Sequence, residues 1–187
     1  SDGHMYCFGL GTVTAGLAAG GYPGVSASEE WDGSSWAEGG TLNDARGLGG
    51  GGAGTQTAGL VAGGYNNVGT CETYNGTSWT EVGDLNTGRN YGVLGGATQN
   101  TAIITGKSPA SANTETFDGS SWTTFDNTNG LNHNIVKSID EAPDGVIWVG
   151  TMTGISYYDG SEWGTLESPH WSGVNVTILN QGISLAI

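Results

Sequence analysis

Short runs of small and apolar residues recur along the chain, and each ends at a glycine or a polar turn. None of them repeats with the helical period of about 3.6 residues, so the pattern predicts β-strands. In the first part of the chain we expect four strands, at Met5–Leu10, Thr14–Ala19, Ser26–Trp31 and Ser35–Glu38. Gly20-Gly21 ends the second strand, and Asp32-Gly33 is a two-residue turn of the kind that needs positive φ.

A six-residue phrase closes this group of strands and returns three more times. The four copies are Trp31–Trp36, Tyr74–Trp79, Phe117–Trp122 and Tyr158–Trp163. Their closing tryptophans are 43, 43 and 41 residues apart. A period of this length is typical of a repeat architecture with one supersecondary unit per copy, and four strands in such a unit is the size of one β-propeller blade.

The later copies predict the same strands. In the second copy we expect them at Leu48–Ala53, Ala58–Ala62, Thr70–Tyr74 and Trp79–Val82, with a turn near Gly54-Thr55-Gln56. The third copy keeps the register at Gly106, but Lys107 replaces the second glycine. The fourth copy predicts strands within 134–139 and at Val146–Thr151, Ile155–Tyr158 and Trp163–Leu166. Val174–Ile178 and Ile183–Ile187 predict two strands of a fifth unit.

We therefore expect an all-β fold, a β-propeller with four four-stranded blades and a partial, two-stranded fifth unit at the C-terminal end. The blades are expected at about 6–46, 47–89, 90–132 and 133–173, and the partial blade at 174–187. One domain would span 6–187, because the even repeat leaves no place to divide the chain. Ser1–Met5 resembles a remnant of cloning and is left out of the site residues.

The phrasing of the repeats resembles known families. An apolar strand closing on Gly-Gly, then an aromatic and then Trp, over Leu10–Phe125, is similar to kelch-type, galactose-oxidase-like propellers, although the aromatic and Trp are closer together here. Thr57–Gly64 followed by Glu72–Trp79 resembles repeats of marine bacteriophage tail-associated proteins, which implies a virion or surface adhesin. Asp144–Thr151 resembles instead the propeller repeat of two-component sensor ectodomains. The catalytic groups of galactose oxidase and the arginine triad of sialidases do not carry over.

Charge and composition exclude several classes of partner. Lys and Arg number 4 against 18 acidic residues, which gives a net charge of −14. Such a field repels phosphate backbones and anionic lipid headgroups, so we expect neither nucleic-acid nor membrane binding. No apolar run is long enough to span a bilayer. Cys7 and Cys71 fall at different positions of the repeat, so we expect no disulfide between them.

The repeated residues that could carry chemistry also have structural roles. The Asp-Gly and Asn-Gly pairs could place metal ligands, but Asn75 fills the slot of Asp32, Asp118 and Asp159 without a charge, which favours turns. The closing tryptophans could stack on sugars, but packing against the preceding aromatic is the favoured interpretation. Trp148 continues an apolar strand and is expected in the core, whereas Trp171, beside Pro169 and His170, is the candidate for an exposed binding contact. We expect no catalytic, cofactor-binding or metal-binding residues.

For function we expect a non-catalytic interaction module, an adhesin or a glycan- or protein-binding propeller, extracellular or virion-associated. Loops that differ among the copies would contact the ligand, namely Tyr22–Val25, Tyr65–Gly69 and Lys107–Asn113. Two alternatives stay open: an enzyme acting on polysaccharides, which would need two converging carboxylates from sets such as Glu29-Glu30 or Asp140-Glu141 and Asp144, and a structural propeller fragment without activity. The incomplete C-terminal blade would leave an unpaired edge, through which two copies could form a homodimer.

Overall fold

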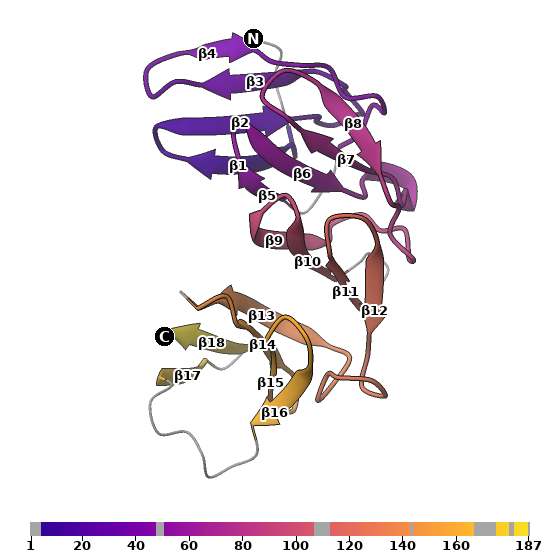
Figure 1. Ribbon diagram of the computed structural model, residues 1–187, viewed down its shortest axis with the longest axis vertical. Coiled ribbons are helices and arrows are strands. Elements are labelled where there is room, and N and C mark those ends of the chain that lie inside the picture. The colour runs from indigo at the N-terminus through magenta and orange to yellow at the C-terminus, as the bar shows by residue number, and fades with distance from the viewer. Residues whose placement is uncertain are drawn as a thin grey trace. The chain divides into compact units, whose positions relative to one another are not determined.

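The computed structural model describes residues 5–47, 51–106, 113–142, 144–166, 175–179 and 182–186. In these residues the chain forms 18 β-strands and one short 3₁₀ turn, η1 (Tyr65–Asn67). Figure 1 labels the strands in chain order. None of its described helical residues makes a segment with the length and hydrophobicity that a membrane span requires.

The strands form four four-stranded sheets and one two-stranded sheet, each in sequential order. The first sheet contains β1 (Phe8–Thr12), β2 (Ala15–Ala19), β3 (Ser28–Trp31) and β4 (Trp36–Glu38). The second contains β5 (Gly52–Thr55), β6 (Ala58–Ala62), β7 (Cys71–Tyr74) and β8 (Trp79–Val82). The third contains β9 (Val93–Thr98), β10 (Thr101–Thr105), β11 (Thr114–Phe117) and β12 (Trp122–Phe125). The fourth contains β13 (Val136–Glu141), β14 (Ile147–Thr151), β15 (Ile155–Tyr158) and β16 (Trp163–Leu166), and the last contains β17 (Asn175–Leu179) and β18 (Gly182–Ala186). This inventory confirms the predicted fold class, down to the two-stranded fifth unit.

The predicted strand bounds are correct or differ by one or two residues for most strands, as for β3, β7, β13 and β14, and they differ by more in β1 and β5, where glycines belong to the strand. β6, β8, β15 and β16 have the bounds that the sequence predicted. β1, however, runs from Phe8 to Thr12 rather than over Met5–Leu10, because Gly11 pairs with Gly16 and Thr12 with Ala15. In the second sheet Thr55 likewise pairs with Ala58, so the turn predicted near Gly54-Thr55-Gln56 begins only after Thr55. Backbone groups make these ladder bonds, so a glycine does not end the strand.

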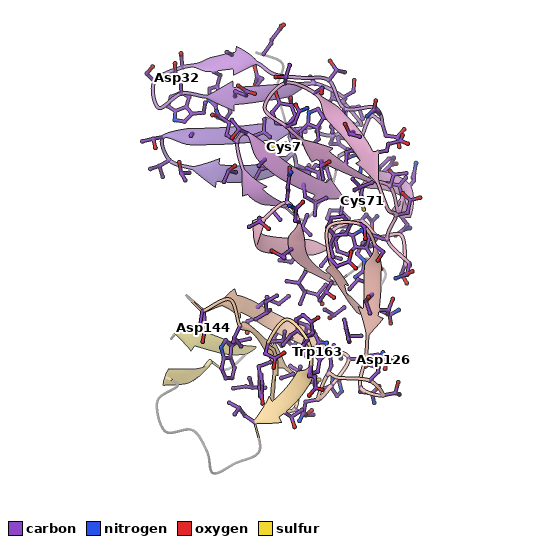
Figure 2. All side chains as sticks on the ribbon, viewed as in Figure 1. Cys7, Asp32, Cys71, Asp126, Asp144 and Trp163 are labelled. Carbon is purple, nitrogen blue, oxygen red and sulfur yellow. The ribbon has the colours of Figure 1, made fainter. Side chains whose placement is uncertain are left out.

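Each four-stranded sheet has two distinct ends. The tight turns that join its first strand to its second and its third to its fourth lie at one end, which we call the hairpin end. The loop between the second and third strands lies at the other, together with the connector to the next sheet, and we call this the connector end. In the first sheet, Figure 2 shows Asp32 at the hairpin end.

The chain divides into two compact units. The N-terminal unit comprises residues 1–111 and 115–123, and the C-terminal unit comprises residues 112–114 and 124–187. The single domain and the blade boundaries expected from the sequence stay predictions.

The core of the N-terminal unit lies between adjacent sheets. One cluster of buried residues joins the first sheet to the second and includes Phe8, Leu17, Leu42, Val61 and Trp79. A second cluster joins the second sheet to the third; it includes Leu60, Leu94, Ile104, Phe117 and Trp122. The innermost strands β1, β5 and β9 contact one another in that order. Each sheet is apolar toward its neighbour, so stacking the repeats buries surface that one sheet alone would leave exposed.

The C-terminal unit contains the fourth sheet and the β17–β18 hairpin, and β18 contacts β13 and β14. Phe125, Tyr158 and Trp163 form an aromatic cluster in this unit, with Phe125 and Trp163 centroids 5.0 Å apart. Through the contacts of β18 with β13 and β14, the two-stranded sheet packs against the inner strands of the fourth sheet.

Candidate functional site

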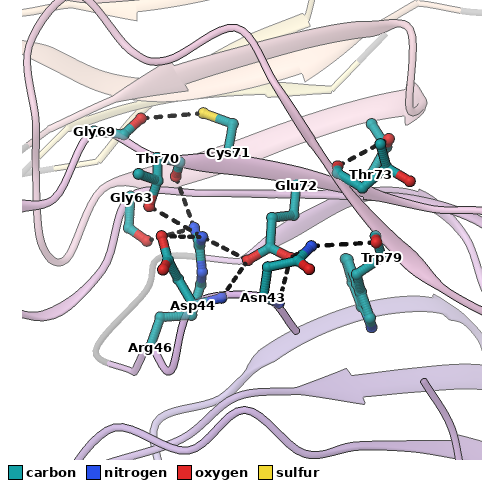
Figure 3. Close-up of polar contacts among 11 residues, drawn as sticks. Asn43, Asp44, Arg46, Gly63, Gly69, Thr70, Cys71, Glu72, Thr73 and Trp79 are labelled. Atoms are coloured by element: carbon teal, nitrogen blue, oxygen red, sulfur yellow. Dashed lines mark hydrogen bonds and ion pairs between the residues drawn. The ribbon is translucent and has the colours of Figure 1, made fainter. Parts of the chain in front are cut away.

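A buried arginine and a buried glutamate link the first connector to the second sheet, as Figure 3 shows. Arg46 Nη2 lies 2.7 Å from Glu72 Oε1, and the two side chains are 1% and 0% exposed. Arg46 Nη1 also donates to the carbonyls of Gly63 (3.3 Å) and Thr70 (2.7 Å). A buried ion pair is tolerated when its remaining hydrogen-bonding groups are satisfied, and these contacts supply most of them.

The connector backbone surrounds the same glutamate. Asn43 donates to Glu72 Oε2 from its backbone N–H at 2.8 Å and from its side-chain amide at 2.9 Å. The backbone N–H of Asp44 donates to Glu72 Oε1 at 3.2 Å. Glu72 therefore holds three successive parts of the connector, through Asn43, Asp44 and Arg46.

The same arrangement returns one repeat later. Arg89 pairs with Glu115, both side chains fully buried, and donates from Nη1 to the carbonyl of Gly106 at 3.3 Å. The backbone N–H groups of Asn86 and Thr87 donate to the Glu115 carboxylate at 2.7 and 3.2 Å. This network was not predicted from the sequence. The signal was present, since Glu72 and Glu115 are themselves 43 residues apart and each follows its arginine by 26.

The C-terminal unit uses a neutral version of this contact. Ser156 occupies the repeat position of Glu115, and the backbone N–H of Asn132 donates to Ser156 Oγ at 2.8 Å, as the backbone N–H of Asn86 donates to the Glu115 carboxylate. The bond between connector and sheet is therefore kept in this unit with a hydroxyl in place of the carboxylate.

The closing tryptophans pack as expected in the second and third sheets. Trp79 and Trp122 are 5% and 6% exposed, and their rings lie 4.8 and 4.9 Å from those of Tyr74 and Phe117. Their indole N–H groups donate to the connector carbonyls of Gly40 and Gly83, at 3.1 and 2.9 Å. Trp36, whose sheet has no preceding sheet in the N-terminal unit, packs on Trp31 but is 49% exposed.

The predictions made for Trp148 and Trp171 have different outcomes. Trp148 is half-buried rather than in the core; its ring packs on Tyr157 with centroids 5.3 Å apart. Trp171, the candidate binding contact, lies outside the described residues, so its role stays a prediction.

The Asp-Gly and Asn-Gly pairs form side-chain-stabilised turns. Asp32 Oδ1 accepts from the backbone N–H groups of Ser34 (2.7 Å) and Ser35 (2.8 Å), and Asn75 Oδ1 accepts from the equivalent groups at 3.0 and 2.9 Å. The backbone N–H of Ser35, above all, lowers the pKa of Asp32 to about 2, and the pKa of Asp118 is lowered to about 2 in the same way by Ser121. Within the described ranges, no three His, Cys, Asp or Glu side chains gather as metal ligands would.

The adjacent carboxylates proposed as an alternative do not converge in β3. Glu29 and Glu30 are neighbours in a strand, so their side chains point to opposite faces of the sheet. Glu30 Oε1 accepts from the hydroxyl of Tyr74 at 2.6 Å. Asp144 caps its own turn by accepting from the Val146 N–H at 3.1 Å. The side chains of Asp140 and Glu141 lie outside the described part of the structure.

Exposed apolar side chains gather at the connector ends of the sheets. Ten large apolar side chains are exposed in the described residues, and eight of them lie at the connector end of their own sheet. These eight are Met5, Tyr6, Tyr22, Tyr65, Tyr91, Val93, Ile135 and Met152. Val13 and Trp36 are the two at hairpin ends.

In the N-terminal unit, two of the loops predicted to contact a ligand meet at this end. Tyr22 and Tyr65 make an edge-to-face contact, with ring centroids 6.0 Å apart and an interplanar angle of 86°, and remain 42% and 41% exposed. The Tyr65 N–H donates to the carbonyl of Gly47 in the connector between them, at 2.7 Å. Residues 107–112 of the third predicted loop lie outside the described residues.

The backbone beside these tyrosines adopts an uncommon conformation. Four described residues other than glycine have positive φ: Tyr6 (53°), Asn66 (64°), Asn67 (59°) and Tyr91 (53°). All four lie at the connector end of the N-terminal unit. Such conformations cost on the order of 1 kcal/mol each and persist where the surrounding structure holds them, most often at functional sites. Tyr22, Tyr65, Asn66 and Asn67 together are called the tyrosine–asparagine site below.

Comparison with known proteins supports the fold. No protein-family model matches the sequence, and a search of curated proteins found no match. Among solved structures, a GH74 enzyme from Niastella koreensis is similar with a TM-score of 0.54, 19% identity and 84% of this chain covered. YCF48 bound to D1 peptide is similar with a TM-score of 0.48 and 12% identity over 88% of the chain, and YCF48 from Cyanidioschyzon merolae with 0.47 and 12% over 95%.

The GH74 enzyme is a β-propeller protein, and its likeness together with the chain's own four-stranded sheets shows the all-β blade architecture of that fold. The chain spans 23% of the length of the GH74 enzyme, and 55% and 62% of the two YCF48 chains. At such identities the likeness concerns the fold alone.

Proposed function

We propose that this protein is a non-catalytic binding module that contacts its ligand at the connector end of the N-terminal unit. The observation that carries the proposal is the Tyr22–Tyr65 contact, in which loops 43 residues apart in the repeat present exposed aromatic rings side by side. The buried pairs Arg46–Glu72 and Arg89–Glu115 repeat unchanged beneath these loops. A rigid scaffold that carries varied, exposed loops is typical of a binding protein.

The residues available for acid–base chemistry support binding rather than catalysis. Glu72 and Glu115 are fully buried and paired with arginines, so neither is available to act on a substrate as an acid or base. Glu30 accepts a hydrogen bond from Tyr74, and Asp32 is held in its turn. These groups stabilise sheets, connectors and turns.

The proposed ligand is a glycan or a cell-surface protein, and the proposed setting is extracellular or virion-associated. The resemblance of the repeats to kelch-type and phage tail-associated sequences motivates this setting. Nucleic acid and anionic membranes are disfavoured because the net charge of −14 repels them.

We also propose that the C-terminal hairpin pairs two copies of the chain. β17 and β18 form a two-stranded sheet where the other sheets have four strands, and an unpaired strand edge favours addition of a strand from another chain. Light scattering on the purified protein tests this: a dimer mass is expected, and a monomer mass at all concentrations contradicts it.

Binding at the connector end is tested with a glycan array and a double substitution. The variant Tyr22→Ala with Tyr65→Ala removes both rings and is expected to lower binding at least tenfold. Val13→Ala is the control, because Val13 is 91% exposed at the hairpin end. Equal binding by both variants, with unchanged melting temperatures, would place the ligand elsewhere.

A further inference from the structure

We infer that the tyrosine–asparagine site takes an uncharged saccharide, in preference to anionic or cationic glycans. This inference rests on the proposed function and narrows it to one chemical class of ligand. It depends on which groups the site exposes, how firmly they are held, and where the positive charges of the N-terminal unit lie.

The exposed groups of the site are all uncharged. Tyr22 and Tyr65 offer ring faces that can pack on the C–H face of a sugar ring, and hydroxyls that can donate or accept. Asn66 and Asn67 are exposed and adjacent, and each amide carries two N–H donors and one carbonyl acceptor. A sugar presents an apolar C–H face together with hydroxyls that both donate and accept, so its chemistry complements this combination.

The site is held in place before any ligand binds. Tyr65 is fixed by its N–H bond to Gly47 and by the edge-to-face contact with Tyr22. Asn66 and Asn67 follow directly, at φ of 64° and 59°. Asparagine tolerates this left-handed region better than most residues do, so the turn presents both amides without needing glycine. Groups held in this way lose little conformational freedom when a ligand binds.

The described cationic side chains of the N-terminal unit are buried rather than exposed at this surface. The cationic side chains among the described residues of the N-terminal unit are Arg46 and Arg89, and both are buried against glutamates. A carboxylate or sulfate on a glycan would therefore meet an overall negative protein, and the described residues of this unit offer it no exposed cation as a partner.

The exposed acid of the neighbouring connector is not part of the site. Asp44 is 50% exposed, and its Oδ2 lies 3.8 Å from Arg46 Nη2, although that guanidinium is already paired with Glu72. None of the four residues of the site carries a charge, so a cationic glycan would find no carboxylate partner within it, and the aromatic and amide groups carry the recognition.

The experiment compares three panels of oligosaccharides of matched length. They are neutral hexose oligomers, anionic uronate or sulfated oligomers, and cationic glucosamine oligomers, each measured by calorimetry at low and high salt. We expect the neutral panel to bind, with an affinity that salt does not change, because screening acts only on charged pairs.

Two variants test the place of binding. Asn66→Gly with Asn67→Gly removes both amides while keeping residues that adopt positive φ, so the fold is retained. Tyr65→Ala removes one ring. Each variant is expected to weaken the binding of neutral oligomers at least tenfold. Val13→Ala should bind them with unchanged affinity, and the melting temperatures of all these variants should stay unchanged.

The outcomes separate this inference from the proposed function. Binding of anionic or cationic oligomers that these variants abolish would overturn the inference and leave the binding function standing. Neutral binding that neither variant weakens would overturn both the inference and the proposed location. Silence across all three panels would overturn the inference, and the glycan array and double tyrosine variant would then decide the proposed function on their own.

Discussion

At the residue scale, the most informative side chains are the buried charges. Arg46 and Glu72 are among the largest fully buried side chains, although charged residues are mostly exposed in proteins. Their pairing offsets a desolvation cost that either charge alone would leave uncompensated. The chain therefore uses its two buried arginines to hold connectors in place, and their loss should affect stability directly.

Glu72→Gln tests this role. The substitution leaves Arg46 buried without its counter-charge and should lower the free energy of unfolding by about 3–5 kcal/mol. Urea denaturation followed by tryptophan fluorescence measures it. Glu81→Gln, at an exposed position of β8, is the matched control and should change stability by less than about 0.5 kcal/mol. An equal, small effect of both variants would contradict the framework role.

The cysteines allow a second test at this scale. Both are free thiols, as their spacing predicted, and Figure 2 labels their positions. Burial raises the pKa of Cys71 to about 12 and also raises that of the half-buried Cys7. Because the thiolate is the reactive form, iodoacetamide near pH 8 should label Cys7 slowly and Cys71 only after unfolding. Mass spectrometry of labelled peptides checks this, and equally fast labelling of both in the native protein would refute it.

At the scale of the element, the recurring unit is a hairpin turn stabilised by one side chain. Asp32 and Asn75 accept the same pair of backbone N–H groups, so the turn needs an acceptor oxygen and not a charge. The charge of the aspartate makes the stability of its turn depend on pH.

Asp32→Asn should keep the turn at neutral pH and remove part of its acid sensitivity. The pKa of Asp32 is lowered to about 2, so its carboxylate stabilises the fold above the ordinary pKa of about 4, and this contribution is lost as the pH falls toward 2. Carboxyl carbon NMR titration should find Asp32 and Asp118 titrating near 2. A midpoint close to 4 for Asp32 in the folded protein would show that the bonds are not retained in solution.

Close packing of a connector against the next sheet also requires glycine at one connector position. A Cβ placed on Gly40 would lie 2.5 Å from the carbonyl oxygen of Thr77 in the next sheet, whereas one placed on Gly9 in β1 would meet nothing within 4 Å. Gly40→Ala should therefore cost about 1–3 kcal/mol through overpacking, and Gly9→Ala should be nearly neutral. Thermal unfolding of the two variants compares them. The explanation fails if Gly9→Ala is the more damaging change.

At the scale of the whole molecule, stability comes from stacking repeats rather than from any one sheet. In the N-terminal unit, buried clusters join successive sheets, and each connector is held by the sheet that follows. Cohesion between neighbours is the expected behaviour of a repeat protein. The net charge of −14, by contrast, acts on the molecule as a whole.

Salt should therefore stabilise the protein. Self-repulsion among the acidic residues opposes the compact state, and added ions screen it. The urea midpoint should rise between low and moderate sodium chloride, with most of the rise complete once the Debye length falls below about 10 Å. A midpoint that falls with salt would indicate that favourable charge pairs at the surface outweigh the repulsion.

The sequence alone determined the repeat, the strand content and the turns. These follow from local chemistry: a 43-residue spacing of aromatic residues, short apolar runs, and Asp-Gly or Asn-Gly pairs that favour one kind of turn. The bounds of β6 and β8 and the fold class could be predicted for this reason. The extra length of β1 through Gly11 could not, because glycine signals a turn locally and only its pairing partner shows a strand.

Only the tertiary structure decided which residues act together. Glu72 pairs with an arginine 26 residues earlier, and Tyr22 meets Tyr65 from the next repeat, across sheets that the spacing does not place in contact. Tyr22–Val25 and Tyr65–Gly69 are loops, as the sequence predicted, but their meeting at one end depends on how the sheets stack. Periodicity reports which positions are alike, whereas contact between copies depends on the packing of their buried faces, which no local pattern encodes.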